Sequence, residues 1–342
     1  MQDNLIRLPR SRGPLRVTPT VLVLGALTML GAGCDGSSLP SESGPPAQAS
    51  SGGAAVIDIA SNTWQARTPL PTGRYALGAA SVNGIVYAIG GWFNGALRTV
   101  EAFDPASKSF VPWRTKAQLP AGRQWPAVAV VGGKIYVAGG LNGGGDATKS
   151  LFVYNPATDH WATKAAMPVV SGNGAAGAIN GKLYVYTPAY GGTDAWLHRY
   201  DPSTNTWTQR AKPPHAFQWL ASGVIDGKLY LAGGVHAGTA VATLDVYDAA
   251  TNTWTTRKSL PSPRGYVAGR ALNGKLYVVG GGTNTPTARV DVYNPATNTW
   301  TRKADMPSAR WNLAATSANG ILYALGGLSP TAGYTANEAY TP

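Results

Sequence analysis

The chain has 342 residues, which suffice for one large domain, and a single cysteine, which excludes an intramolecular disulfide. Gly and Pro are abundant, only 13% of the residues are charged, and the formal net charge of +12 favours polyanions such as acidic glycans or membrane surfaces. No cluster of Lys and Arg alternates with aromatic residues on one predicted element, so we expect no nucleic-acid partner.

Residues 1–33 have the pattern of an export signal. Four arginines precede an apolar run from Val21 to Ala32, which is too short to span a bilayer because spanning takes about 20 apolar residues. The run ends at Cys34 in the sequence Leu-Gly-Ala-Gly-Cys, which resembles the lipobox of bacterial lipoproteins, in which this cysteine receives a lipid. Gly31 departs from that motif, which usually has Leu or a similar residue there. We expect lipidation of Cys34, with simple signal-peptide cleavage or a retained anchor as alternatives.

The next segment, residues 34–53, is rich in Ser, Gly and Pro and predicts a flexible tether with an r.m.s. reach of roughly 25 Å. The folded domain is expected to span residues 54–342. Without residues 1–33 the chain keeps 24 basic and 15 acidic residues, hence a net charge of +9, so the folded part is basic too. We expect a membrane-anchored lipoprotein of the bacterial cell envelope, periplasmic or at the cell surface, or a secreted protein if no lipid is attached.

Six copies of one pattern fill the folded domain, and successive copies lie 46 to 49 residues apart. Each copy carries an apolar-Tyr pair, at Tyr87, Tyr136, Tyr184, Tyr230, Tyr277 and Tyr323. A second aromatic residue follows in each copy, at Phe103, Tyr154, Tyr200, Tyr247, Tyr293 and Tyr340. A glycine doublet follows the first tyrosine in five copies, beginning at Gly90, Gly139, Gly233, Gly280 and Gly326. A third aromatic residue closes each unit, at Trp64, Trp161, Trp207, Trp254 and Trp300, with Phe110 in the remaining place.

Each copy predicts four short strands, because apolar runs of four to six residues alternate with turn residues and no stretch has the 3.6-residue period of a helix. The first and second strands are joined by Asn-Gly or an equivalent pair, whose positive φ suits a tight type I′ hairpin. The third and fourth strands are joined by Asp-Pro or Asn-Pro turns in four copies. One such unit cannot bury its apolar face until a neighbour stacks on it, so the repetition indicates the blades of a propeller.

These residues resemble the kelch family, whose blade runs from an arginine through small and apolar residues to Tyr, Gly-Gly, Tyr and Trp, and the resemblance covers residues 54–342. We therefore predict an all-β fold, a six-bladed β-propeller of kelch repeats. The chain stops at Pro342 just after a third strand, while residues 56–64 look like a fourth strand that lacks its first three. The N-terminal strand is expected to complete the last blade, which leaves only short, protected edges.

The loops that differ from blade to blade fall on one face, and variable loops on a rigid frame are where binding usually occurs. In kelch adaptors, the positions two residues beyond the repeated arginine and the loops after the glycine doublet line the ligand pocket. This resemblance implies seven ligand-binding residues: Trp92, Trp125, Asn173, Trp219, His236, Tyr266 and Asn312. An exposed indole offers a flat apolar surface with one donor, which suits sugar rings or peptide side chains. Interblade packing is the alternative role for Trp125, Trp219 and Trp311.

The repeated arginines, by contrast, are expected to be mainly structural because they recur: Arg74, Arg123, Arg264 and Arg310. Blades three and four break the pattern, with Ser171 and Phe217 in place of the arginine, and departures from local rules concentrate at functional sites. His215 and His236 should share the variable face, but no third ligand has motif spacing, so we predict no metal site and no cofactor.

Catalytic groups cannot be assigned from the sequence. Most acidic residues occupy turns or recurring strand positions, and only Asp146 and Asp194 are candidates for free carboxylates on the variable face. Kelch copper oxidases use a cysteine crosslinked to a ligand tyrosine, whereas Cys34 lies outside the propeller.

The main hypothesis is a monomeric, non-catalytic propeller that binds an extracytoplasmic protein or glycan. An alternative is an enzyme like the sialic acid mutarotases, which are also six-bladed kelch proteins, or another carbohydrate-active enzyme. A structural module of a surface assembly is a third possibility, because one propeller fold hosts many functions.

Overall fold

The computed structural model describes residues 61–189, 193–330 and 334–342, all within a compact unit that spans Ile57–Pro342. The predicted signal peptide, Cys34, the tether and the expected start of the folded domain at residue 54 lie outside the described residues. In the part of the chain that the structure describes, no helix has the length and apolar character needed to cross a membrane.

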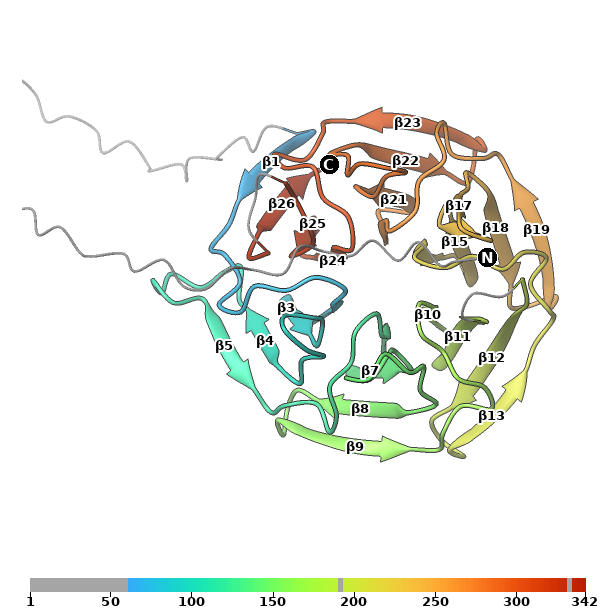
Figure 1. The fold of residues 1–342 in the computed structure, drawn as a ribbon, viewed down its shortest axis with the longest axis horizontal. Helices are drawn as coiled ribbons and strands as arrows, with labels where there is room; N and C mark the ends of the chain where they lie inside the picture. Colours follow the sequence, from blue (N-terminus) through green and yellow to red (C-terminus); the bar gives the residue numbers. More distant parts are fainter. Residues whose placement is uncertain (1–60, 190–192, 331–333) are drawn as a thin grey trace, which may run out of the picture. The chain divides into compact units, whose positions relative to one another are not determined.

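Six four-stranded antiparallel sheets form a ring around a central axis, as predicted (Figure 1). The strands nearest the axis are β2 (Gly78–Val82), β6 (Ala127–Val131), β10 (Ala175–Ile179), β14 (Ala221–Ile225), β20 (Ala268–Leu272) and β24 (Ala314–Ala318). The second strands are β3 (Ile85–Ile89), β7 (Lys134–Ala138), β11 (Lys182–Pro188), β15 (Lys228–Ala232), β21 (Lys275–Val279) and β25 (Ile321–Leu325). The third strands are β4 (Val100–Phe103), β8 (Leu151–Asn155), β12 (Ala195–Asp201), β18 (Leu244–Asp248), β22 (Val290–Asn294) and β26 (Asn337–Thr341). The outer strands are β5 (Trp113–Lys116), β9 (His160–Lys164), β13 (Thr206–Gln209), β19 (Thr253–Arg257), β23 (Thr299–Lys303) and β1 (Thr63–Ala66).

The predicted ring closure is confirmed. Strand β1 pairs antiparallel with β26, with Trp64 opposite Tyr340, so the N-terminal strand completes the sixth blade. The strand covers Thr63–Ala66, later in the chain than the 56–64 segment predicted for it, of which 56–60 is outside the described residues. A short extra hairpin, β16 (Val235–His236) with β17 (Thr239–Ala240), extends from blade four.

The hairpins between first and second strands have the predicted turn chemistry. Both turn residues adopt positive φ in each blade, as at Asn83 (51°) and Gly84 (78°), which matches the twist of the flanking strands. The innermost strands alternate between side chains that pack between blades and side chains that face the axis, since neighbouring residues of a strand point to opposite sides. The strands thereby supply both the core and the wall of an axial channel.

The hydrophobic core consists of six clusters, each formed by two adjacent blades. The first tyrosine of one blade meets the second aromatic of a neighbour, as in Tyr87 with Tyr154 at 6.0 Å between ring centroids. The same contact joins blade six to blade one through Tyr323 and Phe103 at 6.1 Å, so the ring closes on equivalent packing. Each blade therefore depends on both neighbours for burial of its apolar faces.

A repeated hydrogen-bond staple links five of the six blade interfaces. In the one between blades five and six, Asn62 Oδ1 accepts from the Ala304 amide (3.0 Å) and the Tyr340 hydroxyl (2.8 Å), while Trp64 Nε1 donates to the Ala304 carbonyl (2.9 Å). Asp159, Asn205, Asn252 and Asn298 occupy the place of Asn62 at the other four interfaces. The Asn-x-Trp pattern thus fixes neighbouring blades to each other.

One predicted closing aromatic is wrong. Phe110 is fully exposed, and Trp113 takes the closing position of blade one. The Trp113 ring lies 5.1 Å from that of Phe103, and its Nε1 donates to the Thr68 carbonyl at 3.0 Å, as the other closing tryptophans do toward their neighbouring blades. The cause is a longer turn between β4 and β5, which displaces the aromatic along the sequence.

Replacing Trp64 with alanine is expected to lower the free energy of unfolding by about 2 kcal/mol, because it removes a half-buried ring and the hydrogen bond that joins the N-terminal strand to blade five. Urea denaturation of the variant and the wild type measures this loss. Phe110→Ala is the control and should change stability by less than about 0.5 kcal/mol, since its ring makes no buried contact. Equal losses in both variants would contradict the role given to the staple.

Candidate functional site

Three of the repeated arginines are buried in ion pairs that support the variable face. Arg310 donates to Glu338 at 2.6 Å and to the carbonyl of Gly326, the first glycine of its blade's doublet, at 2.9 Å. Arg74 with Glu101 and Arg264 with Asp291 repeat this arrangement in blades one and five. Desolvation lowers the pKa of Arg264 to about 10 even though Asp291 opposes this shift. The arginines therefore hold the loops that form the mouth, which agrees with the structural role predicted for them.

Blade two keeps the arginine but replaces its acidic partner with an aromatic ring. The guanidinium of Arg123 lies 5.1 Å from the ring centroid of Phe152 and donates to Ser150 Oγ. Blade four has the converse change. Phe217 stands at the arginine position, and the buried Asp245 bonds to His215 Nδ1 (2.9 Å) and accepts a hydrogen bond from Thr256 Oγ1 (2.8 Å).

The two histidines predicted on the variable face of blade four do lie near one another. Phe217 separates them, because its ring stacks on His215 at 5.4 Å and meets His236 edge-on at 6.4 Å. Among the described residues there is no group of three His, Cys, Asp or Glu side chains that could hold a metal ion.

Blade three has neither partner of the ion pair, since Ser171 replaces the arginine and His198 replaces the acid. Desolvation lowers the pKa of His198, so protonation favours the unfolded chain and stability should fall as pH drops below about 6.5. The contribution of His198 to the pH dependence of the free energy of unfolding is up to about 1.4 kcal/mol per pH unit. His198→Phe, which introduces the residue found at the equivalent position Phe152 of blade two, should remove this contribution. Denaturation at pH 7.5 and 5.5 measures it, and an unchanged pH slope in the variant would contradict this reading.

The mouth of the channel is built from residues held in an uncommon backbone conformation. Five of the six equivalent positions beyond the repeated arginine have left-handed φ, namely Ala76 (56°), Trp125 (46°), Trp219 (53°), Tyr266 (55°) and Asn312 (54°). Large side chains rarely adopt this conformation, and the strain persists only where the surrounding structure imposes it. Backbone hydrogen bonds between blades do so here, from the amide of Trp125 to the carbonyl of Ala76 (2.7 Å) and from that of Ala76 to Asn312 (2.8 Å).

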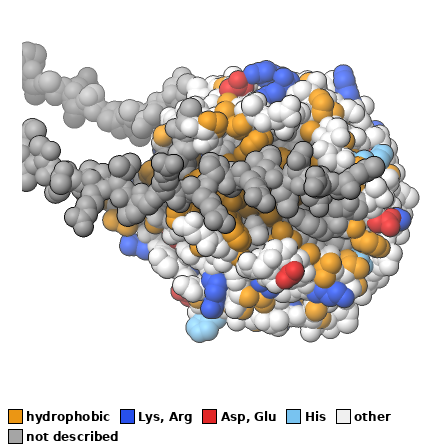
Figure 2. Space-filling model, in the orientation of Figure 1, with side chains coloured by type: hydrophobic (Ala, Val, Ile, Leu, Met, Phe, Trp, Pro, Cys, Tyr) orange, Lys and Arg blue, Asp and Glu red, His pale blue; other side chains and the backbone are white. Residues whose placement is uncertain are grey.

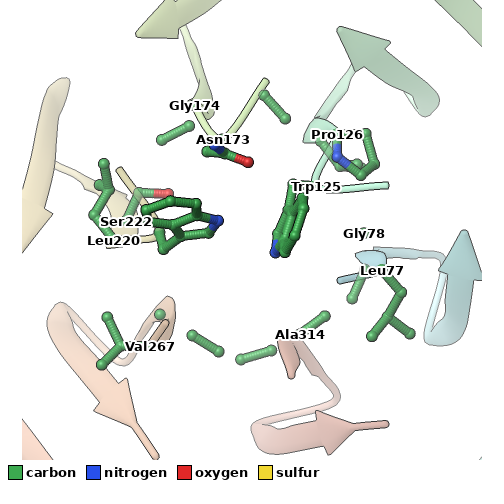
Figure 3. A pocket seen from close by; sticks show the side chains of 18 of the residues that line it. Leu77, Gly78, Trp125, Pro126, Asn173, Gly174, Leu220, Ser222, Val267 and Ala314 are labelled. Carbon is green, nitrogen blue, oxygen red and sulfur yellow. The ribbon is translucent and has the colours of Figure 1, made fainter. Parts of the chain in front are cut away.

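Four of these residues, Trp125, Trp219, Tyr266 and Asn312, line a pocket of about 130 Å³ to which all six blades contribute. Figure 3 shows the indole of Trp125 standing in the cavity and the amide of Asn173 directed toward its centre. Trp125 lies 6.0 Å from Trp219, which lies 4.7 Å from Tyr266, and Tyr266 lies 5.9 Å from Trp311, all between ring centroids. The four rings, which come from blades two, four, five and six, form an aromatic arc at the mouth, and the first three of them line the pocket. Trp125 Nε1 donates across it to Asn312 Oδ1 at 3.0 Å.

Polar atoms in this pocket lack partners. Both amide atoms of Asn173, whose side chain is buried, and Nε1 of Trp219 make no hydrogen bond with the residues that the structure describes. Buried polar groups in native proteins are nearly always hydrogen-bonded, so each of these atoms calls for a partner beyond the described residues, such as water or a ligand. The pocket thus combines a flat apolar surface with one hydrogen-bond acceptor, Asn173 Oδ1, and two donors, Asn173 Nδ2 and Trp219 Nε1.

Five of the seven predicted ligand-binding residues line this pocket: Trp125, Asn173, Trp219, Tyr266 and Asn312. The other two do not line it. Trp92 lies in the loop after β3, where it bridges to Tyr75 and Ala96, and His236 lies in β16 with Nδ1 2.8 Å from the Ala216 carbonyl.

The two predicted free carboxylates have partners, contrary to expectation. Asp194 pairs with Lys212 at 2.8 Å, and Asp146 accepts a hydrogen bond from the amide of Asn142 at 3.1 Å. Neither residue is among those that line the pocket. The short polar loops let nearby Lys and Asn side chains reach these carboxylates, which the sequence spacing did not indicate.

A second cavity of about 280 Å³ lies along the channel and shares six lining residues with the mouth pocket, including Ala79, Ser222 and Ala315. Small residues of the innermost strands form most of its wall. Arg270 of β20 is the exception and was missed by the sequence reasoning. The sequence does contain a signal for it, because Arg270 is an arginine at a strand position where the other blades have small residues.

Basic side chains on one face of the propeller do not form one continuous patch. On the face seen in Figure 2, Lys and Arg are dispersed around the propeller and Asp and Glu lie between them. On this face the positive charge is dispersed, so it does not by itself mark a site there.

Comparisons with known proteins agree with this architecture. Residues 163–327 match the family model described as the KLHDC2/KLHL20/DRC7 Kelch-repeats domain, and residues 73–112 and 126–168 match the Kelch motif. Among 831 matching chains of solved structures is one titled "Structure of YjhT", with 18% sequence identity and a TM-score of 0.67. The match covers 79% of this chain and 94% of that chain and shows a common fold. No curated protein matches the chain.

Proposed function

The chain belongs to the kelch-repeat family of β-propellers, and from this premise we propose that it is a non-catalytic binding module whose mouth pocket holds a saccharide unit of a glycan. The observation that carries the proposal is the pairing of the aromatic arc with the unpartnered polar atoms of Asn173 and Trp219. A sugar ring presents apolar C–H faces to aromatic rings and hydroxyl groups that donate and accept hydrogen bonds.

Preorganisation of the pocket favours binding. The strained backbone at Trp125, Trp219 and Tyr266 is fixed by hydrogen bonds between blades, so little conformational entropy is lost when a ligand enters. The pocket is lined by aromatic, amide, hydroxyl and aliphatic side chains, which are the kinds of groups that line small-molecule sites in proteins.

A glycan array followed by calorimetric titration with a panel of free sugars tests the proposal. Trp219→Ala and Asn173→Ala are each expected to weaken binding at least tenfold, since each removes a ring face or a pair of polar contacts at the centre of the site. Trp92→Ala is the matched control, because this tryptophan lies near the mouth but does not line the pocket, and its affinity should equal that of the wild type.

Two outcomes would redirect the search. Absence of any saccharide ligand, or equal affinity in all variants, would overturn the glycan proposal and leave a protein partner as the alternative. An increased rate of anomer exchange of a bound sugar, followed by NMR in the same titrations, would favour the mutarotase-like alternative over simple binding.

We also propose that the propeller is exported and anchored in the bacterial envelope by a lipid on Cys34, with the segment 34–53 as a tether. The arginines before the apolar run and the lipobox-like end of that run support this placement. Detergent phase partitioning of the expressed protein tests it, since Cys34→Ser should move the protein from the detergent phase to the aqueous phase. Aqueous partitioning of the wild type would contradict the anchor.

A further inference from the structure

Arg270 occupies a position that is otherwise reserved for small or neutral side chains. It is the third residue of its innermost strand, and the equivalents in the other five blades are Ala80, Ala129, Gly177, Gly223 and Thr316. Side chains at this position face the next blade. Arg270 accordingly reaches blade six, where its Nε donates to Ser317 Oγ at 3.4 Å, a long hydrogen bond.

The guanidinium lies in a part of the channel that has no balancing charge. Among the described residues that line either cavity, Arg270 is the one charged side chain, and no described carboxylate forms an ion pair with it. Desolvation lowers its pKa, and no neighbouring acid offsets this effect. Three of the four repeated arginines differ in this respect, since Arg74, Arg264 and Arg310 each have a carboxylate, whereas Arg123 bonds to Ser150 and lies over the ring of Phe152.

We infer that Arg270 forms an oxyanion-binding site in the axial channel, which takes a small molecule through its carboxylate or phosphate group. The planar guanidinium matches either group with two parallel hydrogen bonds, and among the described residues Arg270 is bonded through its Nε alone, to Ser317. The cavity of about 280 Å³ greatly exceeds the roughly 30 Å³ that one water molecule occupies, so it has room for such a group.

Neighbouring hydroxyl groups complete the site. Ser222 lines both cavities, and Ser317 lies beside Arg270, so each can donate a hydrogen bond to an anionic oxygen near the guanidinium. The small residues Gly223, Gly269 and Ala271 leave the channel open around it. This inference does not depend on a saccharide at the mouth.

Titration of the full chain with inorganic phosphate and, separately, with acetate tests the inference, with calorimetry and the shift in melting temperature as readouts. Saturable binding of at least one anion is expected in the wild type. Arg270→Ala, which copies Ala80 and Ala129 and is therefore compatible with the fold, should lower the association constant at least tenfold. Arg270→Lys keeps the charge but loses the planar fork and should bind with intermediate affinity.

Two controls separate the site from general electrostatics and from the mouth. Arg114→Ala removes the same charge from an exposed position of β5 and should bind anions like the wild type. Trp219→Ala should also keep anion binding, even if it abolishes saccharide binding. Binding of phosphate alone or of acetate alone identifies the preferred group. The inference is overturned if neither anion binds saturably or if Arg270→Ala binds as tightly as the wild type.

Discussion

Replacing Arg310 with alanine is expected to lower the free energy of unfolding by about 3 to 5 kcal/mol, because it leaves the buried carboxylate of Glu338 without its ion-pair partner. The guanidinium is fully buried and also bonds to the Gly326 carbonyl, so the substitution opens a gap beneath the mouth as well. Among the described residues, the Glu338 carboxylate would keep the hydrogen bond from the Ser308 hydroxyl, which is 2.7 Å away. Chemical denaturation monitored by tryptophan fluorescence measures the loss.

The control for this prediction is a surface pair of similar geometry. Arg302 donates to Asp305 at 2.7 Å, but both side chains are about half exposed, so Arg302→Ala should cost less than about 1 kcal/mol. Similar losses for Arg302→Ala and Arg310→Ala would show that burial does not decide the strength of these pairs, contrary to our account.

Replacing Gly326 with alanine is expected to destabilise the propeller by about 3 kcal/mol. Its φ of 59° disfavours any side chain, and an added Cβ would lie 2.4 Å from the carbonyl oxygen of Arg74 in the next blade. The doublet glycine is therefore required both by its conformation and by the close approach of two blades.

Gly132 separates these two effects. It has nearly the same φ, 55°, but nothing lies within 4 Å of an added Cβ. Gly132→Ala should cost only about 1 kcal/mol, the conformational part alone. Comparison of the two denaturation midpoints isolates the contribution of blade contact, and a Gly326→Ala variant as stable as Gly132→Ala would contradict it.

The sequence predicted the fold well because the repeat constrains it six times. Strand type, hairpin turns and blade number follow from spacing that recurs, and the lone N-terminal strand indicates the closure. The error at Phe110 arose where one copy is longer in its turn between the third and fourth strands. A single aromatic displaced by three residues cannot be distinguished from its neighbour by composition, whereas contact with Phe103 and Thr68 identifies Trp113 at once.

The candidate site was less predictable. The family resemblance placed Trp125, Trp219 and Asn173 at the mouth. The left-handed backbone of Trp125 and Trp219 was not predictable, because it depends on hydrogen bonds between neighbouring blades, which join residues far apart in the sequence. Trp92 and His236 lie in the loops after the glycine doublets and do not line the pocket, because they are engaged there with Tyr75, Ala96 and Ala216. Arg270 was overlooked because its strand position packs between blades in the other five copies, and the spacing does not show that a long side chain there also reaches the channel.

The most direct test of the central proposal is a crystal structure of the protein soaked with the saccharide that binds best in the titrations. The account predicts that the sugar ring packs against Trp125 and Trp219 and that a hydroxyl group bonds to the amide of Asn173. A sugar that binds outside the mouth pocket, or one whose contacts leave Asn173 and Trp219 without partners, would contradict it.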